Sequence, residues 1–524
     1  MDVSEFTALV GKTEKLSGQQ VRNLKKIQNI SDKFHKDAGI KPVTNKIAED
    51  TIVLESGHQP NFLPHSGLFK KVFMLDFLKK KLEEKGKSCV AVFGFADYNL
   101  ASAHLLYKNR VPALNRNGFQ KVGFSVPKDK WKAFSAIQKP SAKDLENELD
   151  EIRDFYINSA KSIKYPENKV RENLKTFEIL IKDSYNKARN FPDMNAFFIA
   201  KLCTSFGFDV NFFRYSDLQK GDIFIEEWAK IIGSLKEFNK IYVSSLKRND
   251  VDINYDENSL PFWYHCDCGV IVPMSVDSFD GMMIHGKCQS CNEGYRFILD
   301  EKELKRRFAR MSMNAVSRNI ILAEGTGTGL FVSGVGGSLA YGRISDEIAE
   351  KLKLKRPLTA AWKSRDYLAG INHMSIVRDF TGSLGIIMED VLGKKASVAI
   401  KGKLNRLESG MKGANESDKQ FFRTRNEHSM ILSKLKNTSF SMGIRPSIIE
   451  MTISLGPGKS IPMEWKNSFS AADMVKENGF YIATGDTIYQ VPGEFAFIEK
   501  EQLAPLYEGI VSLGRIADKS REGK

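Results

Sequence analysis

The feature that most constrains the fold is a strand–loop–helix–strand pattern in residues 52–96. An apolar run leads into a polar loop over 56–67 that holds two histidines, and a periodic segment with one apolar face follows over 68–84. A run typical of a second buried strand then covers 89–96. Together these segments predict a βαβ unit. Open α/β sheets bind ligands outside the carboxyl ends of their strands, so this loop is the first candidate for an active site.

The candidate loop carries side chains suited to binding and proton transfer. Imidazoles at His58 and His65 can act as acid–base groups near neutral pH or donate to phosphate oxygens. The predicted helix after the loop offers free backbone amides to an anion. Further predicted substrate- or phosphate-binding residues of this region are Ser56, Gly57, Gln59, Asn61 and Lys70. The alternative is a structurally capped loop in which the histidines only fill a polar cavity.

A second candidate region is rich in glycine and spans residues 323–341. Its glycine spacing suits a backbone that passes close to a ligand, and we select Gly334, Gly336 and Gly337 as binding residues. The segment lacks the G-x-G-x-x-G fingerprint of dinucleotide-binding proteins. Residues 456–460 imitate a phosphate-binding loop, but their glycine spacing predicts a plain turn.

Four cysteines form two close pairs about 20 residues apart. The ligands Cys266, Cys268, Cys288 and Cys291 predict a zinc ribbon. Four thiolates would complete a tetrahedral site, so we expect this zinc to be structural. The ribbon would then stabilise a long insertion or, alternatively, contact nucleic acid. The two other cysteines, Cys89 and Cys203, lie in apolar contexts and are expected in the core.

Charge and composition limit the partners. The formal net charge is +14 and the isoelectric point about 9.2, which favours an anionic small molecule or a nucleotide. The basic residues are dispersed, so nucleic acid is a less favoured partner. The sequence has no apolar run of about 18 residues and no secretion signal at its N-terminus. With cysteines in metal-ligand pairs, these features predict a cytoplasmic protein that does not span a membrane.

The length of 524 residues suggests roughly three domains. We predict an α/β fold with a Rossmann-like core, helical and zinc-ribbon insertions and a mostly helical C-terminal region. The predicted segments are an N-terminal helical segment (1–50), the first half of the core (51–127), a helical insertion (128–205), a continuation of the core (206–261), the zinc-ribbon insertion (262–300), the second half of the core (301–375) and an α-rich C-terminal domain (376–524).

Within these segments, apolar runs predict strands at 209–214 and 240–245, with a helix near 219–238 between them. A strand followed by glycines is predicted over 319–337. Helices are predicted over 397–437, with breaks at Gly402, Gly410 and Gly413, and short strands over 446–500.

The two candidate regions together resemble the cysteine-adding enzymes of bacillithiol synthesis, the BshC family. Ser56-Gly57-His58-Gln59-Pro60 occupies the place of the family's T-G-Q-Q-P-like loop, and 333–341 resembles its V-G-G-P-G-E-I-A-Y-like segment. Val90-Ala91-Val92-Phe93 is similar to the family's V-P-V-F run. The resemblance covers about 50–110 and 315–370. His58 stands where the family has glutamine, and the cysteine module is an addition.

The resemblance implies a Rossmann-like core similar to class I aminoacyl-tRNA synthetases, a helical C-terminal region that forms a homodimer, and a reaction that joins cysteine to glucosaminyl-malate. It places an acidic residue at Glu324. We expect Glu324 and Asp97 to orient the amine or remove its proton, with His58 and His65 binding phosphate or carboxylate.

Three functions follow for testing. The first is a BshC-like ligase that condenses an amino acid, with cysteine implied by the resemblance, and an amine or amino-sugar conjugate, with ATP as the implied activating nucleotide. The second is a nucleotidyl-transfer enzyme of the superfamily whose first loop carries a H-I-G-H-type motif. The third is an RNA-associated zinc-ribbon protein that uses the basic residues near 302–310.

Overall fold

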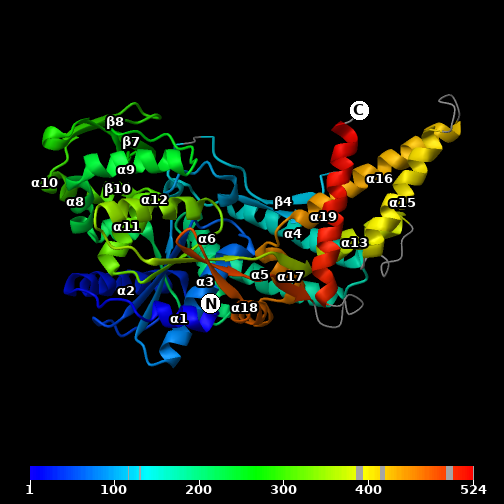
Figure 1. The fold of residues 1–524 in the computed structure, drawn as a ribbon, viewed down its shortest axis with the longest axis horizontal. Coiled ribbons are helices and arrows are strands. Elements are labelled where there is room, and N and C mark those ends of the chain that lie inside the picture. Colours follow the sequence, from blue (N-terminus) through cyan, green and yellow to red (C-terminus); the bar gives the residue numbers. More distant parts are fainter. Residues whose placement is uncertain (116, 129–130, 385–393, 413–418, 491–499, 523–524) are drawn as a thin grey trace.

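The computed structural model describes residues 1–524 apart from 116, 129–130, 385–393, 413–418, 491–499 and 523–524. Its centre is a seven-stranded sheet in the order β14-β15-β12-β11-β1-β2-β5 (Figure 1). The strands are β1 (Ile52–His58), β2 (Cys89–Phe95), β5 (Asn211–Arg214), β11 (Leu330–Ser333), β12 (Leu358–Lys363), β14 (Asp473–Glu477) and β15 (Phe480–Thr484). Within this sheet only β14 is antiparallel to its neighbour, so the fold is mixed α/β on a mostly parallel sheet.

The six parallel strands have the order of the doubly wound Rossmann arrangement. Numbered along the chain from first to sixth, they lie as 3-2-1-4-5-6 across the sheet. β1 pairs with β2 on one side, and on its other side Leu54 lies opposite Leu330 of β11. The strand order therefore reverses between β1 and β11, and in such folds this switch point is where ligands bind.

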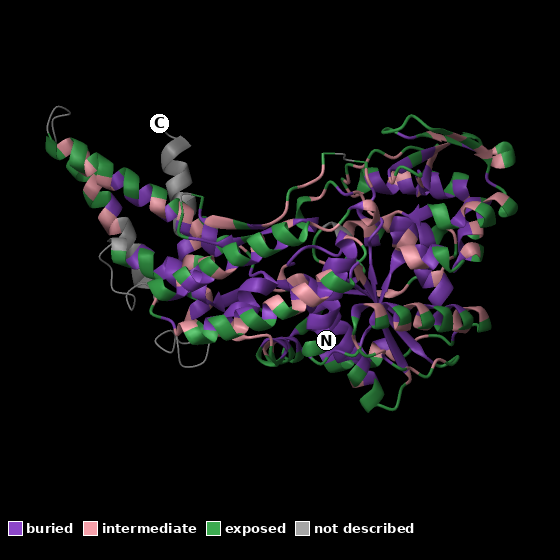
Figure 2. Ribbon diagram, turned by 180° about the vertical axis from the view of Figure 1, so that it is seen from behind, coloured by how far each residue is buried: buried purple, intermediate pink, exposed green. Residues whose placement is uncertain are grey.

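Alternate residues of the strands face different layers, because side chains along a strand alternate between its two faces. On one face, Leu54, Ala91 and Phe93 belong to a core shared with α3 (Ser66–Glu84), α6 (Phe191–Ser205) and α18 (Ser460–Ser470). On the other face, Val90 and Val92 pack with α7 (Tyr215–Lys220), α8 (Ile225–Gly233), α9 (Leu235–Arg248), α11 (Ala315–Thr326) and α12 (Gly337–Lys351). The buried residues in Figure 2 accordingly concentrate around the sheet.

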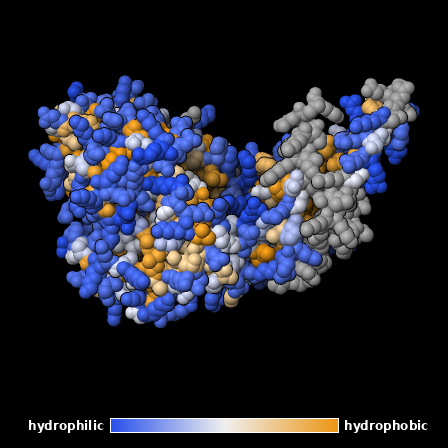
Figure 3. Space-filling view, in the orientation of Figure 1, coloured by the Kyte–Doolittle hydropathy of each residue, from blue (hydrophilic) through white to orange (hydrophobic). Residues whose placement is uncertain are grey.

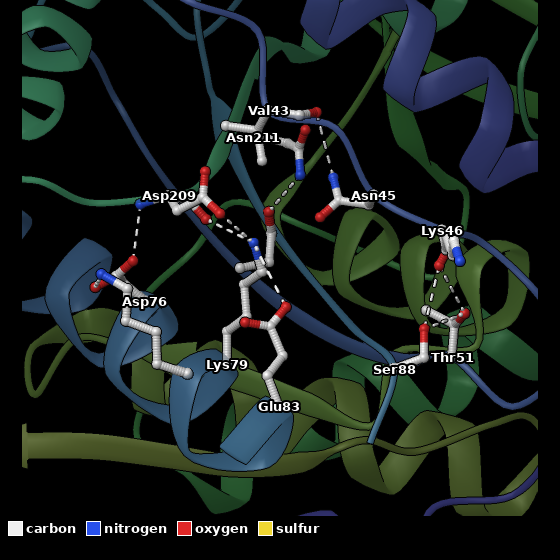
Figure 4. A network of polar contacts seen from close by, with 12 residues as sticks. Val43, Asn45, Lys46, Thr51, Asp76, Lys79, Glu83, Ser88, Asp209 and Asn211 are labelled. Atoms are coloured by element: carbon white, nitrogen blue, oxygen red, sulfur yellow. Dashed lines mark hydrogen bonds and ion pairs between the residues drawn. The ribbon is translucent and has the colours of Figure 1, made fainter. Parts of the chain in front are cut away.

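A polar network fixes α3 against the sheet (Figure 4). Nζ of Lys79 donates to Oδ2 of Asp209 at 2.7 Å, and the amide of Asp209 donates to Oδ1 of Asp76 at 2.7 Å. Just before β2, Oγ of Ser88 donates to the carbonyl oxygen of Lys46 at 3.1 Å. These bonds hold the C-terminal half of α3, and because α3 follows β1, its first turn lies at the carboxyl edge of the sheet.

The N-terminal segment is helical, as predicted. Its helices α1 (Val3–Val10) and α2 (Gly18–Ala38) both begin with a capping box, in which the cap side chain and the third helical residue satisfy each other's backbone amides. α2 packs against β5 and α11. The segment is therefore part of the layer that covers the sheet.

The segment between β2 and β5 contains a hairpin and the predicted helices. The hairpin consists of β3 (Lys108–Pro112) and β4 (Phe119–Gly123), and the helices are α4 (Ala142–Ser162), α5 (Glu167–Lys187) and the buried α6. Short 3-10 helices occur at η1 (His104–Leu106) and η2 (Phe134–Ala136).

The cysteine-rich insertion forms an antiparallel sheet in the order β10-β6-β7-β8-β9. Its elements are β6 (Ser259–His265), β7 (Ile271–Ser278), η3 (Asp280–Met282), β8 (Met283–Lys287), β9 (Gly294–Ile298), α10 (Glu301–Arg307), η4 (Phe308–Arg310) and β10 (Met311–Met313). We call the part from β6 to β9 the ribbon.

The C-terminal part contributes both helices and strands. In Figure 1, α15 (Lys394–Lys412) and α16 (Lys419–Gly443) project from the body as a helical arm beside α13 (Ile371–Leu384) and α19 (Lys500–Glu522). β13 (Asp366–Ala369) pairs with β16 (Thr487–Gln490), and α17 (Ile448–Leu455) precedes α18. Because β14 and β15 belong to the main sheet, that sheet takes strands from both sides of the predicted boundary at 376.

Three regions in which strands were predicted contain helices instead over part or all of their length. Residues 240–245 lie in α9, residues 319–326 lie in α11, and residues 448–455 and 460–470 of the predicted strand region form α17 and α18. In α11 and α17, burial on nearly all sides removes the helical period from the pattern of apolar residues. In α9, the short run Ile241-Tyr242-Val243, whose residue types are common in strands, concealed a buried face that also includes Leu235 and Phe238.

The predicted breaks in the C-terminal helices also differ. α15 continues through Gly402 and Gly410, while Gly413 and residues 491–499 of the predicted strand region lie outside the described residues. Hydrophilic side chains cover most of the face in Figure 3, with apolar ones scattered among them. In the described part of the chain, no helix combines the length and the apolar character needed to cross a membrane.

Candidate active site at the carboxyl edge of the sheet

Two adjoining cavities open at the switch point. The first has a volume of about 420 Å³ and lies between the loop after β1, the start of α3 and the glycine segment after β11. The second, of about 570 Å³, lies between the same loop, α11, α12 and the ribbon. His58, Gln59 and Lys71 line both cavities. The two cavities therefore form one site in two parts.

His58 lies at the boundary between the two parts of the site, and its imidazole has a single protonation state near neutral pH. Its Nδ1 lies 2.8 Å from the carbonyl oxygen of Gln59, and because a carbonyl only accepts, Nδ1 carries the proton. Burial, aided by the charge of Lys71, lowers the pKa of His58 to about 3. The imidazole is therefore neutral at physiological pH and keeps the lone pair of Nε2 as an acceptor.

Of the two cavities, His65 and Asn61 line the first. His65 precedes the first turn of α3, and burial beside Arg445 lowers the pKa of its imidazole. Asn61 is buried, and its Oδ1 has no hydrogen-bond partner among the described protein atoms. An unpartnered buried amide oxygen is costly, so Asn61 is a group that a bound ligand would satisfy.

Ser56 and Gly57, predicted to bind substrate, support the sheet instead. Oγ of Ser56 donates to the carbonyl oxygen of Val332 at 2.6 Å, which joins β1 to β11. A Cβ on Gly57 would lie 2.3 Å from Oη of Tyr215, so this glycine makes room for a tyrosine. The backbone of Gly57 does border the second cavity. β1 extends through His58, so Ser56 and Gly57 are strand residues and their side-chain positions face neighbouring protein atoms.

Lys70 lines the first cavity, but its charge is already paired. Nζ lies 2.5 Å from Oδ1 of Asp366 and 2.6 Å from Oγ of Ser364, and it stands over the ring of Trp362 at 4.3 Å. Ser66, in the first turn of α3, also donates to Asp366. Lys70 therefore ties α3 to β13, and its amine has little capacity left for a ligand.

The next residue, Lys71, is the functional group that sequence reasoning missed. Its side chain is 7% exposed, and its Nζ lies 3.2 Å from the carbonyl oxygen of Gly57. No carboxylate of the described residues forms an ion pair with it. Burial, together with the positive charge of Arg318, lowers the pKa of this amine to about 7. One signal was available: Lys71 lies three residues after Leu68 and four before Leu75, within the apolar face of the helix.

Two arginines complete a cluster of cations at the edge of the sheet. Arg318 of α11 lines the second cavity, stands over the ring of Tyr215 at 5.0 Å and has a buried Nε without a protein partner. Arg445, after α16, is exposed and lines the first cavity. Within the described residues neither forms an ion pair. Their sequence neighbours carry no distinctive motif, so only the tertiary structure identifies them.

The glycine segment meets the first loop across the switch point. Gly334 and Gly336 line the first cavity, and Gly337 begins α12 without a side chain capping the helix. The amide of Leu339 donates to the carbonyl oxygen of Gly336 at 3.1 Å, so the first two amides of α12 are the ones available to an anion. The structure brings together the two candidate regions, although they are far apart in the sequence.

Asp97 and Glu324, predicted to act on the amine, line neither cavity. Oδ1 of Asp97 accepts from the amide of Ser216 at 3.1 Å and Oδ2 from its hydroxyl at 2.5 Å, while burial raises the pKa of Asp97 to about 6. Asp97 thus holds the start of α7. Glu324 lies in α11 and accepts from the amide of Lys355 at 2.7 Å. Because β11 begins at Leu330, Glu324 precedes the amino end of that strand, opposite the cavities.

The four cysteines of the ribbon form a group that could hold one metal ion. Their Sγ atoms all lie within 4.8 Å of one another, with separations of 3.4 Å for Cys266–Cys291 and 3.5 Å for Cys268–Cys288. Zn–S bonds of about 2.3 Å in a tetrahedron require sulfur separations just under 4 Å, so the donor set fits zinc. His265, which bonds Ser312, and His285, which pairs with Asp277, are engaged elsewhere.

Four of the five basic residues near 302–310 are paired with carboxylates. Lys305 pairs with Glu301 at 2.8 Å, Arg306 and Arg307 both pair with Glu303, and Arg310 pairs with Asp267 at 2.6 Å. Neutralised side chains of this kind attract an anion weakly. This segment therefore lends no support to RNA binding.

We found no protein-family model that matches the chain and no curated protein of similar sequence. The class that the fold and site define is a doubly wound α/β protein with a cation-rich cavity at its switch point and, beside it, a cluster of four cysteines that could hold a metal ion.

Proposed function

We propose that this chain is a carbon–nitrogen ligase that joins the carboxyl group of an amino acid to an amine, as in the BshC family that its two loops resemble. On this proposal the amino acid is cysteine, the amine belongs to an amino-sugar conjugate, and the core is related to class I aminoacyl-tRNA synthetases. We further propose that the metal of the ribbon is zinc, with a structural role, because four thiolates leave no open position for a substrate.

The observation that carries the proposal is the position of Lys71. A ligase of this kind needs a base that removes a proton from the attacking amine. Lys71 lines both cavities, has no ion-pair partner among the described residues, and has a pKa of about 7, so a large fraction is neutral at physiological pH. Lys70, by contrast, is held in a buried ion pair with Asp366, so its amine is already engaged by a carboxylate.

The remaining groups support binding on either side of Lys71. Phosphate oxygens of an activating nucleotide would meet the free amides at the start of α12, the backbone of Gly334 and Gly336, and the guanidinium of Arg445. The lone pair of His58 Nε2 would accept a hydrogen bond from the amine. Arg318 would hold an anionic group of the amine substrate in the second cavity.

The reaction then balances in two steps. ATP transfers a phosphoryl or adenylyl group to the carboxylate, which releases ADP or pyrophosphate. The amine attacks the activated carbonyl carbon, the C–N bond forms as the bond to the phosphate oxygen breaks, and Lys71 takes the proton from nitrogen. The cluster of cations stabilises the negative charge that develops on the leaving phosphate.

The test is product formation by the purified zinc-loaded protein. Incubation with ATP, cysteine and glucosaminyl-malate, or a panel of amino-sugar conjugates, should give an ATP-dependent product whose mass equals that of the two substrates minus water. The Lys71→Ala variant should lose this product, whereas Glu324→Ala should keep it. Product formation by Lys71→Ala at the wild-type rate would contradict the role of Lys71, and absence of any product across the panel would contradict the ligase.

A second candidate, nucleotidyl transfer, is favoured by one observation: aromatic side chains lie next to cations in the second cavity, an arrangement suited to a nucleotide. Incubation with labelled ATP and a mixture of metabolites separates the candidates. Nucleotidyl transfer predicts pyrophosphate release that does not depend on cysteine or any other amino acid.

A further inference from the structure

The ribbon forms part of the second cavity. Leu260 and Trp263 of β6 and Ile271 of β7 line it, together with side chains from the main body. The metal-ligand turn at Cys266–Cys268 joins these same two strands: β6 ends at His265 and β7 begins at Ile271. Trp263 and Ile271 are therefore placed by the same turn that would bind the metal.

The same turn also holds the opposite wall through backbone pairing. The amide of Ile271 donates to the carbonyl oxygen of Trp131 at 2.8 Å, and the amide of Ala133 donates to that of Gly269 at 2.8 Å. The 131–133 segment in turn accepts a hydrogen bond at 2.8 Å from the amide of Ala101 to the carbonyl oxygen of Lys132. Residues 99–103 follow β2, and most of them line the cavity. A continuous ladder thus runs from the metal site through 131–133 to the loop at the end of β2.

The lining of the cavity indicates a ligand with a flat ring. Four aromatic side chains line it: Tyr242, Tyr255, Trp263 and Tyr341. Tyr242 and Tyr255 lie against each other with ring centroids 4.2 Å apart, while the Nε of Arg318 is buried without a protein partner. Aromatic side chains bind flat rings by stacking, and a guanidinium prefers carboxylate or phosphate.

We infer that the second cavity binds a flat ring joined to a carboxylate or phosphate, and that the four-cysteine site determines the shape of this cavity. The ring is either a heteroaromatic ring or a sugar ring that stacks through its apolar face. The inference deepens the proposed function by naming the chemistry of the second substrate, and it holds whether or not the reaction is a condensation. The metal site is then a positioning element for substrate binding.

Two glycines beside the metal ligands provide a matched pair of variants. Gly269 has a φ of +85°, and a Cβ there would lie 2.8 Å from Cβ of Ala136, so Gly269→Ala would displace the turn from the 131–136 segment. A Cβ at Gly294, near the other cysteine pair, would have nothing within 4 Å, so Gly294→Ala is the control. Neither change removes a cysteine.

The experiment measures binding by calorimetry, with adenosine 5′-monophosphate and glucosamine 6-phosphate as separate probes and inorganic phosphate as the ringless control. We expect one probe to bind the zinc-loaded protein at least tenfold more tightly than phosphate, and the probe that does so identifies the kind of ring. Trp263→Ala and Gly269→Ala should each weaken this binding at least tenfold, with zinc content unchanged and Gly294→Ala equal to wild type. Removal of zinc by a chelator should abolish the binding.

Two results would overturn the inference. One is equal binding of phosphate and both ring-bearing probes to the zinc-loaded protein. The other is wild-type affinity in Gly269→Ala and in metal-free protein whose main thermal transition is unchanged. Because these are binding measurements, they can fail while the ligase assay succeeds, and the reverse is also true.

Discussion

The basic residues at the carboxyl edge of the main sheet differ from those beside the ribbon in the partners they have. Lys71, Arg318 and Arg445 line the cavities, and in the described structure no carboxylate forms an ion pair with them. Beside the ribbon, Lys305 and Arg310 are paired with Glu301 and Asp267. The comparison shows that a net charge of +14 does not indicate where on the molecule an anion binds. Unpaired cations in a partly enclosed cavity attract a ligand far more strongly than paired cations at the surface.

The first and largest effect should follow removal of the metal. Apparent binding free energies of structural zinc are on the order of 10 kcal/mol, so chelation should unfold the ribbon locally. Asp267 lies between two metal ligands, so its pair with Arg310 should be lost, which would reduce the contrast between the two regions by one paired cation. Hydrogen exchange measured by mass spectrometry should show fast exchange over 259–298, with the main sheet still protected. Unchanged protection of the ribbon after metal removal would rule out this dependence.

The second-largest effect should follow the replacement of Lys71, whose neutral amine we propose as the proton acceptor. Loss of a general base lowers turnover by about 10²–10⁴-fold, so Lys71→Ala should lower kcat within that range. Its base form is the neutral amine, which predominates above a pKa of about 7, so kcat/KM of the wild type should rise with pH through that value. Steady-state kinetics measure both. The paired lysine provides the control, since Lys305→Ala should leave kcat and the pH profile unchanged.

The third prediction concerns Glu55, a buried carboxyl group of β1. Burial raises the pKa of Glu55 from 4.5 to about 7, although the charge of Arg318 acts in the opposite direction, so the group is largely neutral in the folded protein below that pH. Because the folded pKa is raised, the stabilising contribution is present below pH 4.5 and is lost as the pH rises through 7. The shift corresponds to about 3 kcal/mol.

Denaturant unfolding at several pH values tests this sign. The free energy of unfolding of Glu55→Gln should depend less on pH between 4.5 and 7 than that of the wild type. A residual slope is expected from Glu148, whose pKa burial also raises to about 7. An identical slope in both proteins would show that folding does not raise the pKa of Glu55.

The smallest effect should come from Arg445, which is exposed. A charge-assisted hydrogen bond to a bound anion contributes about 1.5 kcal/mol, so Arg445→Gln should raise KM for the nucleotide about tenfold and leave kcat nearly unchanged. Arg306→Gln, which removes a paired arginine beside the ribbon, should change neither constant. If both variants raise KM equally, the contrast between paired and unpaired cations does not govern binding.

Much of the fold follows from patterns that are local in the sequence. The β1–α3–β2 unit was predictable because apolar periodicity distinguishes an exposed helix face from a buried strand. The cysteine cluster was predictable because metal ligands in tight turns have short, regular spacings. The buried helices α11 and α17 were not, because a helix surrounded by protein loses the polar face that reveals its period.

The candidate site was predictable only in part. His58 ends β1 and Gln59 and Asn61 follow it closely, so their place at the carboxyl end of a strand could be inferred from the sequence. Lys70 and Lys71 are adjacent residues of the same type, and nothing in their spacing says which of them is paired. Asp366, almost 300 residues later, neutralises Lys70, whereas no carboxylate of the described residues pairs with Lys71.

By itself, the sequence determined the βαβ unit, the four-cysteine cluster and the glycine segment, since each depends on residues that are close along the chain. The tertiary structure alone decided that the glycine segment meets the first loop, that the ribbon forms a wall of the second cavity, and which cations remain unpaired. The physical reason is that charge pairing and burial depend on neighbours in space, and parallel strands bring those neighbours together from distant parts of the chain.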